Sequence, residues 1–217
     1  MKCKYFNEKE TINTEEINKI AKEIVMGKNV IFPTETVYGI GTNAFDQEAC
    51  ERIFSIKGRP NNKPLIVLIS DFKMLKQMVS HVNEIERKLI EEFWPGPLTI
   101  IFKKKEDSNI PDVVTAGQDT IGVRMTSGKI ARLLIQKAGV PIVAPSANLT
   151  GQPTGTKIEE IIKDLGDQAD YIIDCGNLDK QIPSTIVKVK NDKIYIIRQG
   201  SITKEQLEKI AIVEMEK

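Results

Sequence analysis

The spacing of the apolar residues switches along the chain between the period of a helix and that of a strand. From residue 17 to residue 25, isoleucine, alanine and valine recur every three or four positions, which predicts an amphipathic helix. Asn13 or Thr14 is placed to cap this helix, and Gly27 is placed to end it. The apolar run at 30–32 and the proline after it predict a strand followed by an irregular loop.

The rest of the chain repeats this exchange of helices and strands. Asp46 is a suitable cap for a second helix, which cannot continue through Gly58 and Pro60. Residues 65–69 form an uninterrupted aliphatic run with the length of a strand that is buried on both faces. Further helices are predicted at 71–79, 84–93, 128–138, 156–165 and 203–212, and further strands at 98–102, 120–124, 141–144, 171–174, 185–189 and 194–198.

The order of these elements indicates the fold class. Helices that alternate with strands predict parallel strand pairs, whereas the short turn at Asn191 and Asp192 predicts an antiparallel hairpin. We therefore expect an α/β fold with a twisted mixed sheet of parallel and antiparallel strands and with helices packed on it. No internal repeat or low-complexity segment divides the sequence, so a single domain over residues 1–217, with its core at about 14–212, is expected.

Composition excludes several classes of protein. The 217 residues carry 31 Lys and Arg against 30 Asp and Glu, and 41% are hydrophobic, so intrinsic disorder is not expected. A net charge of +1 also argues against a dedicated nucleic-acid binder. Cys3, Cys50 and Cys175 are few and widely spaced, which predicts a reduced, cytoplasmic protein. The longest aliphatic run, 65–69, is far too short to span a membrane.

Common catalytic motifs do not account for the sequence. Neither Gly-Lys pair is followed by Ser or Thr, as a P-loop requires. Residues 39–44 fit the loose G-x-G-x-x-A pattern of dinucleotide-binding proteins, but a lone match is weak. The single histidine, His81, lies at a predicted helix boundary, where a surface or capping role is expected. One histidine also leaves little basis for a metal site or a Ser-His-Asp triad.

Polar residues gather instead where predicted strands end. Ligands of open α/β sheets bind at the carboxyl ends of strands, so these segments are candidate parts of one site. The candidate segments are 33–39, 57–64, 145–148 and 183–185.

Two of these segments leave a structural and a chemical interpretation open. Lys57, Arg59 and Lys63 belong either to a basic surface loop or to a phosphate cradle, because Arg binds phosphate as a fork and Lys as a point charge. Ser146 and Asn148 either form an ordinary turn that caps a strand or donate hydrogen bonds to a phosphate oxygen.

Taken together, these motifs closely resemble the YrdC/Sua5 family of threonylcarbamoyl-AMP synthases. The resemblance covers about residues 20 to 210, with the motifs in the family's order. The chain resembles the single-domain form of the family, without the additional C-terminal domain of longer Sua5 proteins. It is carried by the segments 32–41, 57–60, 63–65, 94–99, 123–124, 144–148 and 183–186.

The resemblance implies an activity and a site. The reaction is L-threonine plus bicarbonate plus ATP giving L-threonylcarbamoyl-AMP, diphosphate and water, the first step of N6-threonylcarbamoyladenosine formation in tRNA. It implies a large concave, electropositive cavity, on which Lys57, Arg59, Lys63, Arg124 and Arg198 are expected to converge. By position, the resemblance implies catalytic and ATP-binding roles for Lys57, Arg59, Ser146 and Asn148, ATP binding by Asn61 and Arg198, threonine binding by Thr34, Lys63, Arg124 and Ser184, and neighbouring places for Thr115 and Thr120.

The same resemblance implies cofactors and partners. Mg²⁺ is expected on the ATP phosphates, with no metal ligands from the protein. The product would pass to a tRNA threonylcarbamoyltransferase complex, with weak tRNA binding as an additional expectation and no membrane association.

Two alternatives stay open at this stage. An RNA-binding factor associated with tRNA or the ribosome would use the same basic residues without chemistry, and its binding would fall steeply with salt. A carbamoyl-transfer domain that uses carbamoyl phosphate, as in hydrogenase maturation, is the second alternative. Threonine-dependent release of pyrophosphate from ATP would separate the synthase from both.

Overall fold

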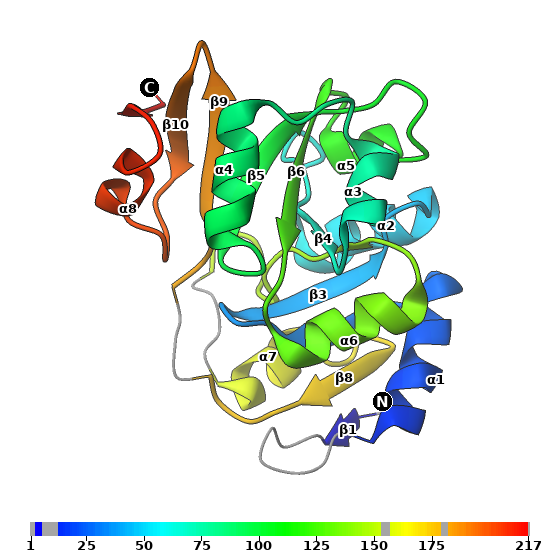
Figure 1. Cartoon of the computed structure of the whole chain (residues 1–217). Helices are drawn as coiled ribbons and strands as arrows, with labels where there is room; N and C mark the ends of the chain where they lie inside the picture. Colours follow the sequence, from blue (N-terminus) through cyan, green and yellow to red (C-terminus); the bar gives the residue numbers. More distant parts are fainter. Residues whose placement is uncertain (1–2, 6–12, 153–156, 179–181, 217) are drawn as a thin grey trace.

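A computed structural model describes residues 3–5, 13–152, 157–178 and 182–216, in which helices and strands alternate (Figure 1). The helices are α1 (Thr14–Val25), α2 (Gln47–Lys57), α3 (Phe72–Met78), α4 (Glu84–Phe93), α5 (Asp112–Thr115), α6 (Lys129–Ala138), α7 (Ile158–Leu165) and α8 (Lys204–Glu208). The strands are β1 (Cys3–Tyr5), β2 (Val30–Pro33), β3 (Tyr38–Asn43), β4 (Val67–Ile69), β5 (Leu98–Lys103), β6 (Thr120–Met125), β7 (Ile142–Val143), β8 (Tyr171–Asp174), β9 (Thr185–Lys190), β10 (Lys193–Arg198) and β11 (Val213–Met215).

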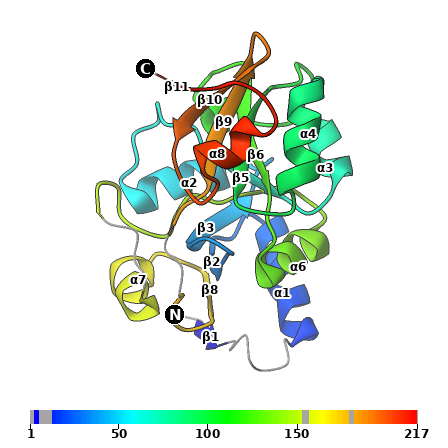
Figure 2. The ribbon, with the colours of Figure 1, turned by 60° about the vertical axis from the view of Figure 1, so that its left-hand side comes forward.

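In the described residues these strands form one sheet in the order β1-β8-β2-β3-β7-β4-β6-β5-β9-β10-β11. Parallel pairs such as β4 with β6 and β5 with β9 occur beside antiparallel pairs such as β2 with β3 and β5 with β6. Helices α3 and α4 lie side by side over the part of the sheet that contains β5 and β6 (Figures 1 and 2). The predicted α/β fold with a mixed sheet is confirmed.

Local capping explains why the helices begin and end where the sequence predicts. The side chain of Asn13 accepts hydrogen bonds from the first turn of α1, and that of Asp46 accepts one from Ala49 N at the start of α2. Gly58 ends α2 with a φ of 56°, a left-handed conformation that glycine adopts without steric cost. Asn83 and Glu86 form a reciprocal capping box at the start of α4.

Strand β3 is the main element that the sequence did not predict. The segment expected to be an irregular loop after Pro33 turns back within four residues, and Tyr38 pairs with Pro33 in an antiparallel hairpin. Residues 39–44 are therefore strand and turn, so no helix begins there as a dinucleotide-binding motif requires. Gly41 allows close packing, because a Cβ at this position would lie 2.5 Å from the carbonyl oxygen of Val143.

The C-terminal region differs from the prediction in one element. The helix expected over 203–212 ends at Glu208, and the chain then forms β11, which pairs parallel with β10. Burial of Val213 favours this strand over a longer helix. The hairpin turn at Asn191 and Asp192 is confirmed, and both residues have left-handed φ values, of 51° and 56°.

Other differences are small. The strands predicted at 65–69 and 141–144 shorten to β4 and β7, and β1 and α5 were not predicted. The start of the helix predicted at 156–165 lies outside the described residues.

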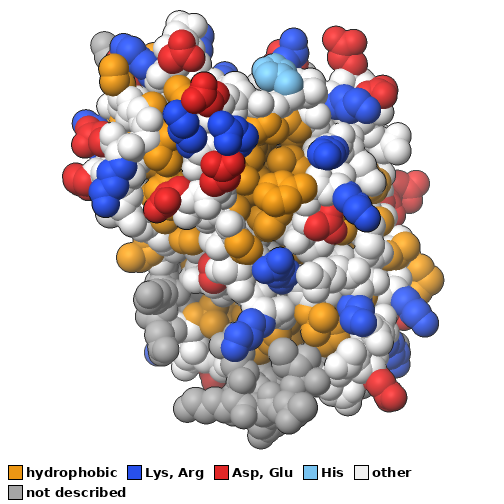
Figure 3. Space-filling model, in the orientation of Figure 1, with side chains coloured by type: hydrophobic (Ala, Val, Ile, Leu, Met, Phe, Trp, Pro, Cys, Tyr) orange, Lys and Arg blue, Asp and Glu red, His pale blue; other side chains and the backbone are white. Residues whose placement is uncertain are grey.

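The surface mixes charges of both signs. Figure 3 shows Lys and Arg side chains interspersed with Asp and Glu over the face that it presents, in agreement with the balanced composition. No helix in the described part of the chain has the length and apolar character needed to cross a membrane.

Candidate active site

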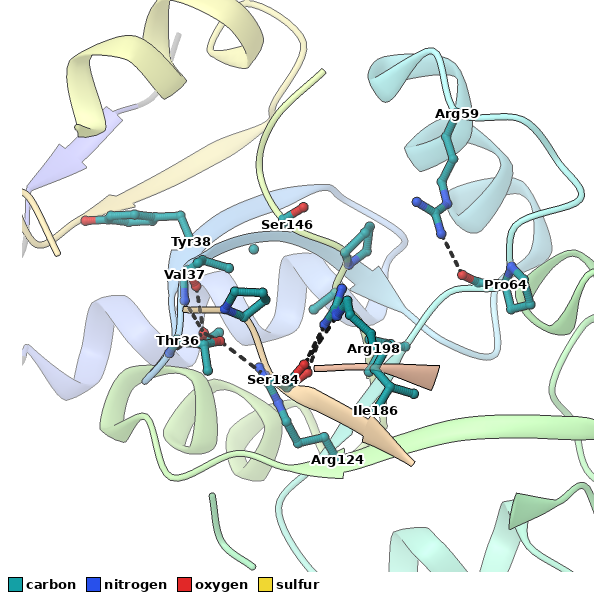
Figure 4. A pocket seen from close by; sticks show the side chains of 16 residues that line it. Thr36, Val37, Tyr38, Arg59, Pro64, Arg124, Ser146, Ser184, Ile186 and Arg198 are labelled. Carbon is teal, nitrogen blue, oxygen red and sulfur yellow. Dashed lines mark hydrogen bonds between the residues drawn. The ribbon is translucent and has the colours of Figure 1, made fainter. Parts of the chain in front are cut away.

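A cavity of about 220 Å³ opens between the β2–β3 hairpin, the loop after β7 and the segment that precedes β9 (Figure 4). It brings together segments that are more than 140 residues apart in the sequence. The residues that line it are Thr34, Thr36, Val37, Tyr38, Gly39, Arg59, Pro64, Ile66, Arg124, Ala144, Pro145, Ser146, Pro183, Ser184, Ile186 and Arg198.

Three arginines from different elements reach this cavity, and no carboxylate is among the described residues that line it. Arg59 follows α2 and donates to the carbonyl oxygen of Pro64 at 2.8 Å. Arg124 lies on β6 and is buried. Arg198 ends β10 and donates from Nη2 to the carbonyl oxygen of Ser184 at 2.9 Å. Figure 4 shows the three side chains pointing towards the cavity from separate sides.

Two of the arginines perturb the third, Arg198. Desolvation lowers the pKa of Arg59 and, more strongly than any other cause, that of Arg198. Repulsion from Arg124 and then from Arg59 lowers the pKa of Arg198 further. A bound anion would relieve this repulsion, so the electrostatics of the cavity favour a negatively charged ligand.

The hairpin turn places hydroxyl groups along one wall. Thr34 Oγ1 donates to the carbonyl oxygen of Val37 at 2.6 Å and accepts from the backbone N–H groups of Thr36 and Val37. Because the single proton of Thr34 is used on Val37, Thr36 must donate in the 3.0 Å contact between the two hydroxyls. Thr36 Oγ1 in turn accepts from Arg124 Nη1 at 3.1 Å.

The loop that contains Ser146 and Asn148 is fixed to strand β3. The backbone N–H of Ile40 donates to Pro145 O at 3.0 Å, and that of Ala147 donates to Tyr38 O at 2.8 Å. Within the loop, Ser146 Oγ donates to Asn148 Oδ1 at 2.5 Å. Ser146 lines the cavity, whereas Asn148 is not among its described lining residues.

Lys57 holds the same loop through its backbone carbonyl groups. It is the last residue of α2, is 3% exposed, and donates from Nζ to the carbonyl oxygens of Ser146 and Asn148. Its own carbonyl accepts from Thr150 N at 2.9 Å. Burial, and then repulsion from Arg59, lowers the pKa of Lys57 to about 8. The interpretation of Lys57 as part of a solvated surface loop is therefore wrong.

Ser184 forms a further part of the cavity wall. Its side chain is buried, lies 2.9 Å from Thr99 Oγ1, and accepts from Arg198 Nη2 at 3.1 Å. Arg198 is thus held by both the backbone and the side chain of Ser184.

The structure brings six of the predicted site residues to one cavity, namely Thr34, Arg59, Arg124, Ser146, Ser184 and Arg198. Lys57 and Asn148 belong to the supporting loop contacts, and the exposed Asn61 and Lys63 are not among the described lining residues. The expected convergence of five cations therefore holds for the three arginines only. Thr115 is buried, and Thr120 lines a neighbouring hollow that shares Pro64, Ile66 and Ile186 with the cavity.

The sequence did not single out Glu35 and Thr36 as separate members of the site. Both belong to the polar segment 33–39, and the turn sends Thr34 and Thr36 towards the cavity and leaves Glu35 outside its described lining. Successive side chains in an extended segment point to opposite faces, so the sequence could have placed Thr34 and Thr36 on one face and Glu35 on the other. Among the described residues, no group of three or more His, Cys, Asp or Glu is placed to hold a metal ion.

Comparison with known proteins gives consistent matches over most of the chain. Residues 22–200 match the family model Sua5_yciO_yrdC, described as "Telomere recombination". Threonylcarbamoyl-AMP synthase of Pyrococcus abyssi is 40% identical over 204 residues, and a putative threonylcarbamoyl-AMP synthase of Methanocaldococcus jannaschii is 40% identical over 200 residues. The crystal structure of P. abyssi Sua5 complexed with L-threonine matches with a TM-score of 0.92 and 37% identity.

The extent of these matches differs between the relatives. The alignment covers 94% of this chain but 59% of the P. abyssi synthase, and 99% of this chain but 63% of the P. abyssi crystal structure. With the M. jannaschii protein it covers 90% of this chain and 93% of the relative.

Proposed function

Because the chain belongs to the Sua5/YciO/YrdC family, we propose that it forms L-threonylcarbamoyl-AMP and diphosphate from L-threonine, bicarbonate and ATP. The observation that carries the proposal is the cavity in which Arg59, Arg124 and Arg198 meet without a lining carboxylate among the described residues. Both polyanionic ATP and the carboxylate of an amino acid need such an environment. The product would enter N6-threonylcarbamoyladenosine formation in tRNA.

The proposed chemistry suits a cavity without a histidine in its described lining. The amine of threonine and bicarbonate form a carbamate and release water. A carbamate oxygen then attacks the α-phosphorus of ATP in line, and diphosphate leaves. Since the carbamate is already anionic at neutral pH, the attack requires no general base. Catalysis then depends on positioning the two anions and on neutralising their charges.

We assign different residues of the cavity to the two substrates. Arg59 and Arg198 face ATP together with Ser146, and Lys57 and Asn148 support that side through the loop that contains Ser146. The carboxylate of threonine is bound by Arg124, with Thr34 and Ser184 nearby. The crystal structure of P. abyssi Sua5 complexed with L-threonine supports L-threonine as the amino-acid substrate.

The proposal extends to cofactors and partners. Arg59 and Arg198 would hold the ATP phosphates to which Mg²⁺ is bound, and the metal would supply neutralisation of negative charge there. The adenylate passes to a tRNA threonylcarbamoyltransferase complex, the protein itself binds tRNA at most weakly, and it acts in the cytoplasm.

The test is release of pyrophosphate from MgATP, measured with and without threonine and bicarbonate. We expect Lys57→Ala and Arg59→Ala each to lower turnover at least tenfold, a loss of about 1.4 kcal/mol or more. Arg87→Ala is the matched control, because Arg87 lies exposed on α4 in an ion pair with Glu91. Near-normal release by both site variants would remove these residues from the site, and absence of threonine-dependent release by the parent would reject the activity.

Ser184→Ala tests the proposed contact of this side chain with threonine. We expect it to raise the threonine concentration needed for half-maximal rate, because Ser184 presents a buried hydroxyl at that wall. An unchanged dependence on threonine would exclude Ser184 from the substrate site.

A further inference from the structure

We infer that Glu35, which does not line the cavity, is a positioning residue that orients Arg124 and makes it the carboxylate-binding end of the site. The inference rests on the proposed function and deepens it. It follows from the contacts of Glu35 on both of its carboxylate oxygens and from a difference between the three arginines of the cavity.

One oxygen of Glu35 is fixed to the start of α6. Glu35 Oε2 accepts from Thr126 Oγ1 and, at 3.3 Å, from the backbone N–H of Gly128, which is the N-cap of α6. A carboxylate is favoured at a helix N-terminus, where backbone N–H groups lack partners. Gly128 permits the approach, because a Cβ there would lie 2.9 Å from Glu35 N.

The other oxygen faces Arg124. Glu35 Oε1 lies 3.8 Å from Arg124 Nε, and the two side chains are only 15% and 7% exposed. Both atoms are buried, and neither has a hydrogen-bond partner in the described part of the chain, so the pairing of their charges is the interaction they make. Burial lowers the pKa of Arg124 and the charge of Glu35 raises it, so the carboxylate favours the charged guanidinium.

Two neighbouring residues of one turn therefore hold two sides of the same guanidinium. Glu35 faces Nε. Thr36 accepts from Nη1 at 3.1 Å, a contact that is drawn in Figure 4. No hydrogen bond from Nη2 to a protein acceptor is found within the described residues, so this nitrogen is available to a ligand in the cavity. The guanidinium is thus oriented before any ligand arrives.

Among the three cavity arginines, Arg124 alone has an acidic partner within the described residues. Arg59 and Arg198 are held by neutral carbonyl oxygens, of Pro64 and Ser184 respectively. Their charges remain uncompensated and suit a polyphosphate. Arg124, already balanced by Glu35, suits a singly charged carboxylate whose position matters more than its charge.

The test is a set of variants assayed for pyrophosphate release with threonine and ATP varied in turn. Glu35→Gln keeps an oxygen that can accept from Thr126 and Gly128 but removes the charge that faces Arg124. We expect its KM for threonine to rise at least tenfold while its KM for ATP changes less than twofold. Glu86→Gln is the matched control, since Glu86 is a buried carboxylate in the capping box of α4 and is not among the described residues that line the cavity. We expect both of its KM values to stay within twofold of the parent.

Three outcomes would overturn the inference. An unchanged threonine KM in Glu35→Gln would mean that the carboxylate does not position Arg124. A lower threonine KM would mean that the carboxylate repels the substrate. An equal rise of both KM values would indicate a general structural role. Absence of threonine-dependent release in the parent protein would instead reject the proposed function.

A double-mutant cycle keeps the inference testable if Glu35→Gln folds poorly. If Glu35 acts through Arg124, then Glu35→Gln/Arg124→Gln has the same threonine KM as Arg124→Gln alone. Urea unfolding of the same variants measures the interaction between Glu35 and Arg124 through the free energy of unfolding, without an enzyme assay. The double variant should lose less stability than the sum of the two single variants, and additive losses would show that the two side chains do not interact.

Discussion

Deprotonation of Lys57 as pH rises is expected to lower activity and to raise the free energy of unfolding. Its ammonium group is buried and holds the Ser146–Asn148 loop through two backbone carbonyls. With a pKa of about 8, the group is about nine tenths protonated at pH 7 and about one tenth at pH 9. A charged donor makes hydrogen bonds roughly twice as strong as a neutral one, so deprotonation loosens the loop.

The expected loss of activity follows from that fraction. If the loop must be held by the ammonium, kcat/KM for ATP should fall about tenfold between pH 7 and pH 9. The chemistry alone would produce the opposite trend, because the amine of threonine becomes a better nucleophile as it loses its proton. A decrease with pH is therefore diagnostic of the protein group.

The effect on stability has the reverse sign. The pKa of Lys57 is lowered from 10.5 in the unfolded chain to about 8 in the folded protein, which corresponds to about 3 kcal/mol. Between these two values the unfolded state binds more protons, so folding becomes more favourable as pH rises. The gain attributable to Lys57 between pH 7 and pH 9 is about 1.3 kcal/mol.

Lys57→Arg is the control for both measurements, because a guanidinium stays protonated throughout this range. Pyrophosphate release and urea unfolding would be measured at intervals from pH 7 to pH 9 for both proteins. We expect the alkaline loss of activity and the extra gain in stability in the parent only. A flat activity profile in the parent, or the same decline in Lys57→Arg, would refute the role of the ammonium group.

Three further predictions concern the scaffold around the site. Asp46→Ala removes the cap of α2 and should lower the free energy of unfolding by about 1 kcal/mol with unchanged kcat/KM, so a large loss of activity would contradict it. Gly41→Ala places a Cβ 2.5 Å from Val143 O and should cost about 1–3 kcal/mol in urea unfolding, whereas unchanged stability would show that the sheet adjusts freely. Thr185→Val breaks three hydrogen bonds, two of them buried, including one of 2.7 Å to Ile202 O, and should cost about 2–4 kcal/mol. Calorimetry showing no fall in Tm would count against it.

The helices were the part of the fold most open to prediction from sequence. The side chains of Asn13 and Asp46 accept hydrogen bonds from backbone N–H groups two or three residues later, and Gly58 ends α2 through its own backbone conformation. These interactions span four residues or fewer, so the local sequence contains all that they require. The end of α8 was predicted wrongly because β11 forms through pairing with β10, a contact that a window of sequence does not contain.

The candidate site shows the same division. The polar segments that contain Thr34, Arg59, Ser146 and Ser184 were identified from their position at the ends of predicted strands, and the structure brings these residues to one cavity. Which cations reach that cavity was not predictable. Lys63 is exposed although the adjacent Pro64 lines the cavity, because an irregular loop has no period from which side-chain direction can be read.

By itself the sequence determined the alternation of helices and strands, the helix boundaries with caps, and the set of polar segments that can serve a site. Only the tertiary structure decided that β3 joins the sheet and that the buried Lys57 side chain donates to the backbone of Ser146. It also decided that Glu35 lies beside Arg124. The physical reason is range. Capping and periodicity act between near neighbours, whereas strand pairing, burial and charge pairing depend on residues brought together from distant parts of the chain.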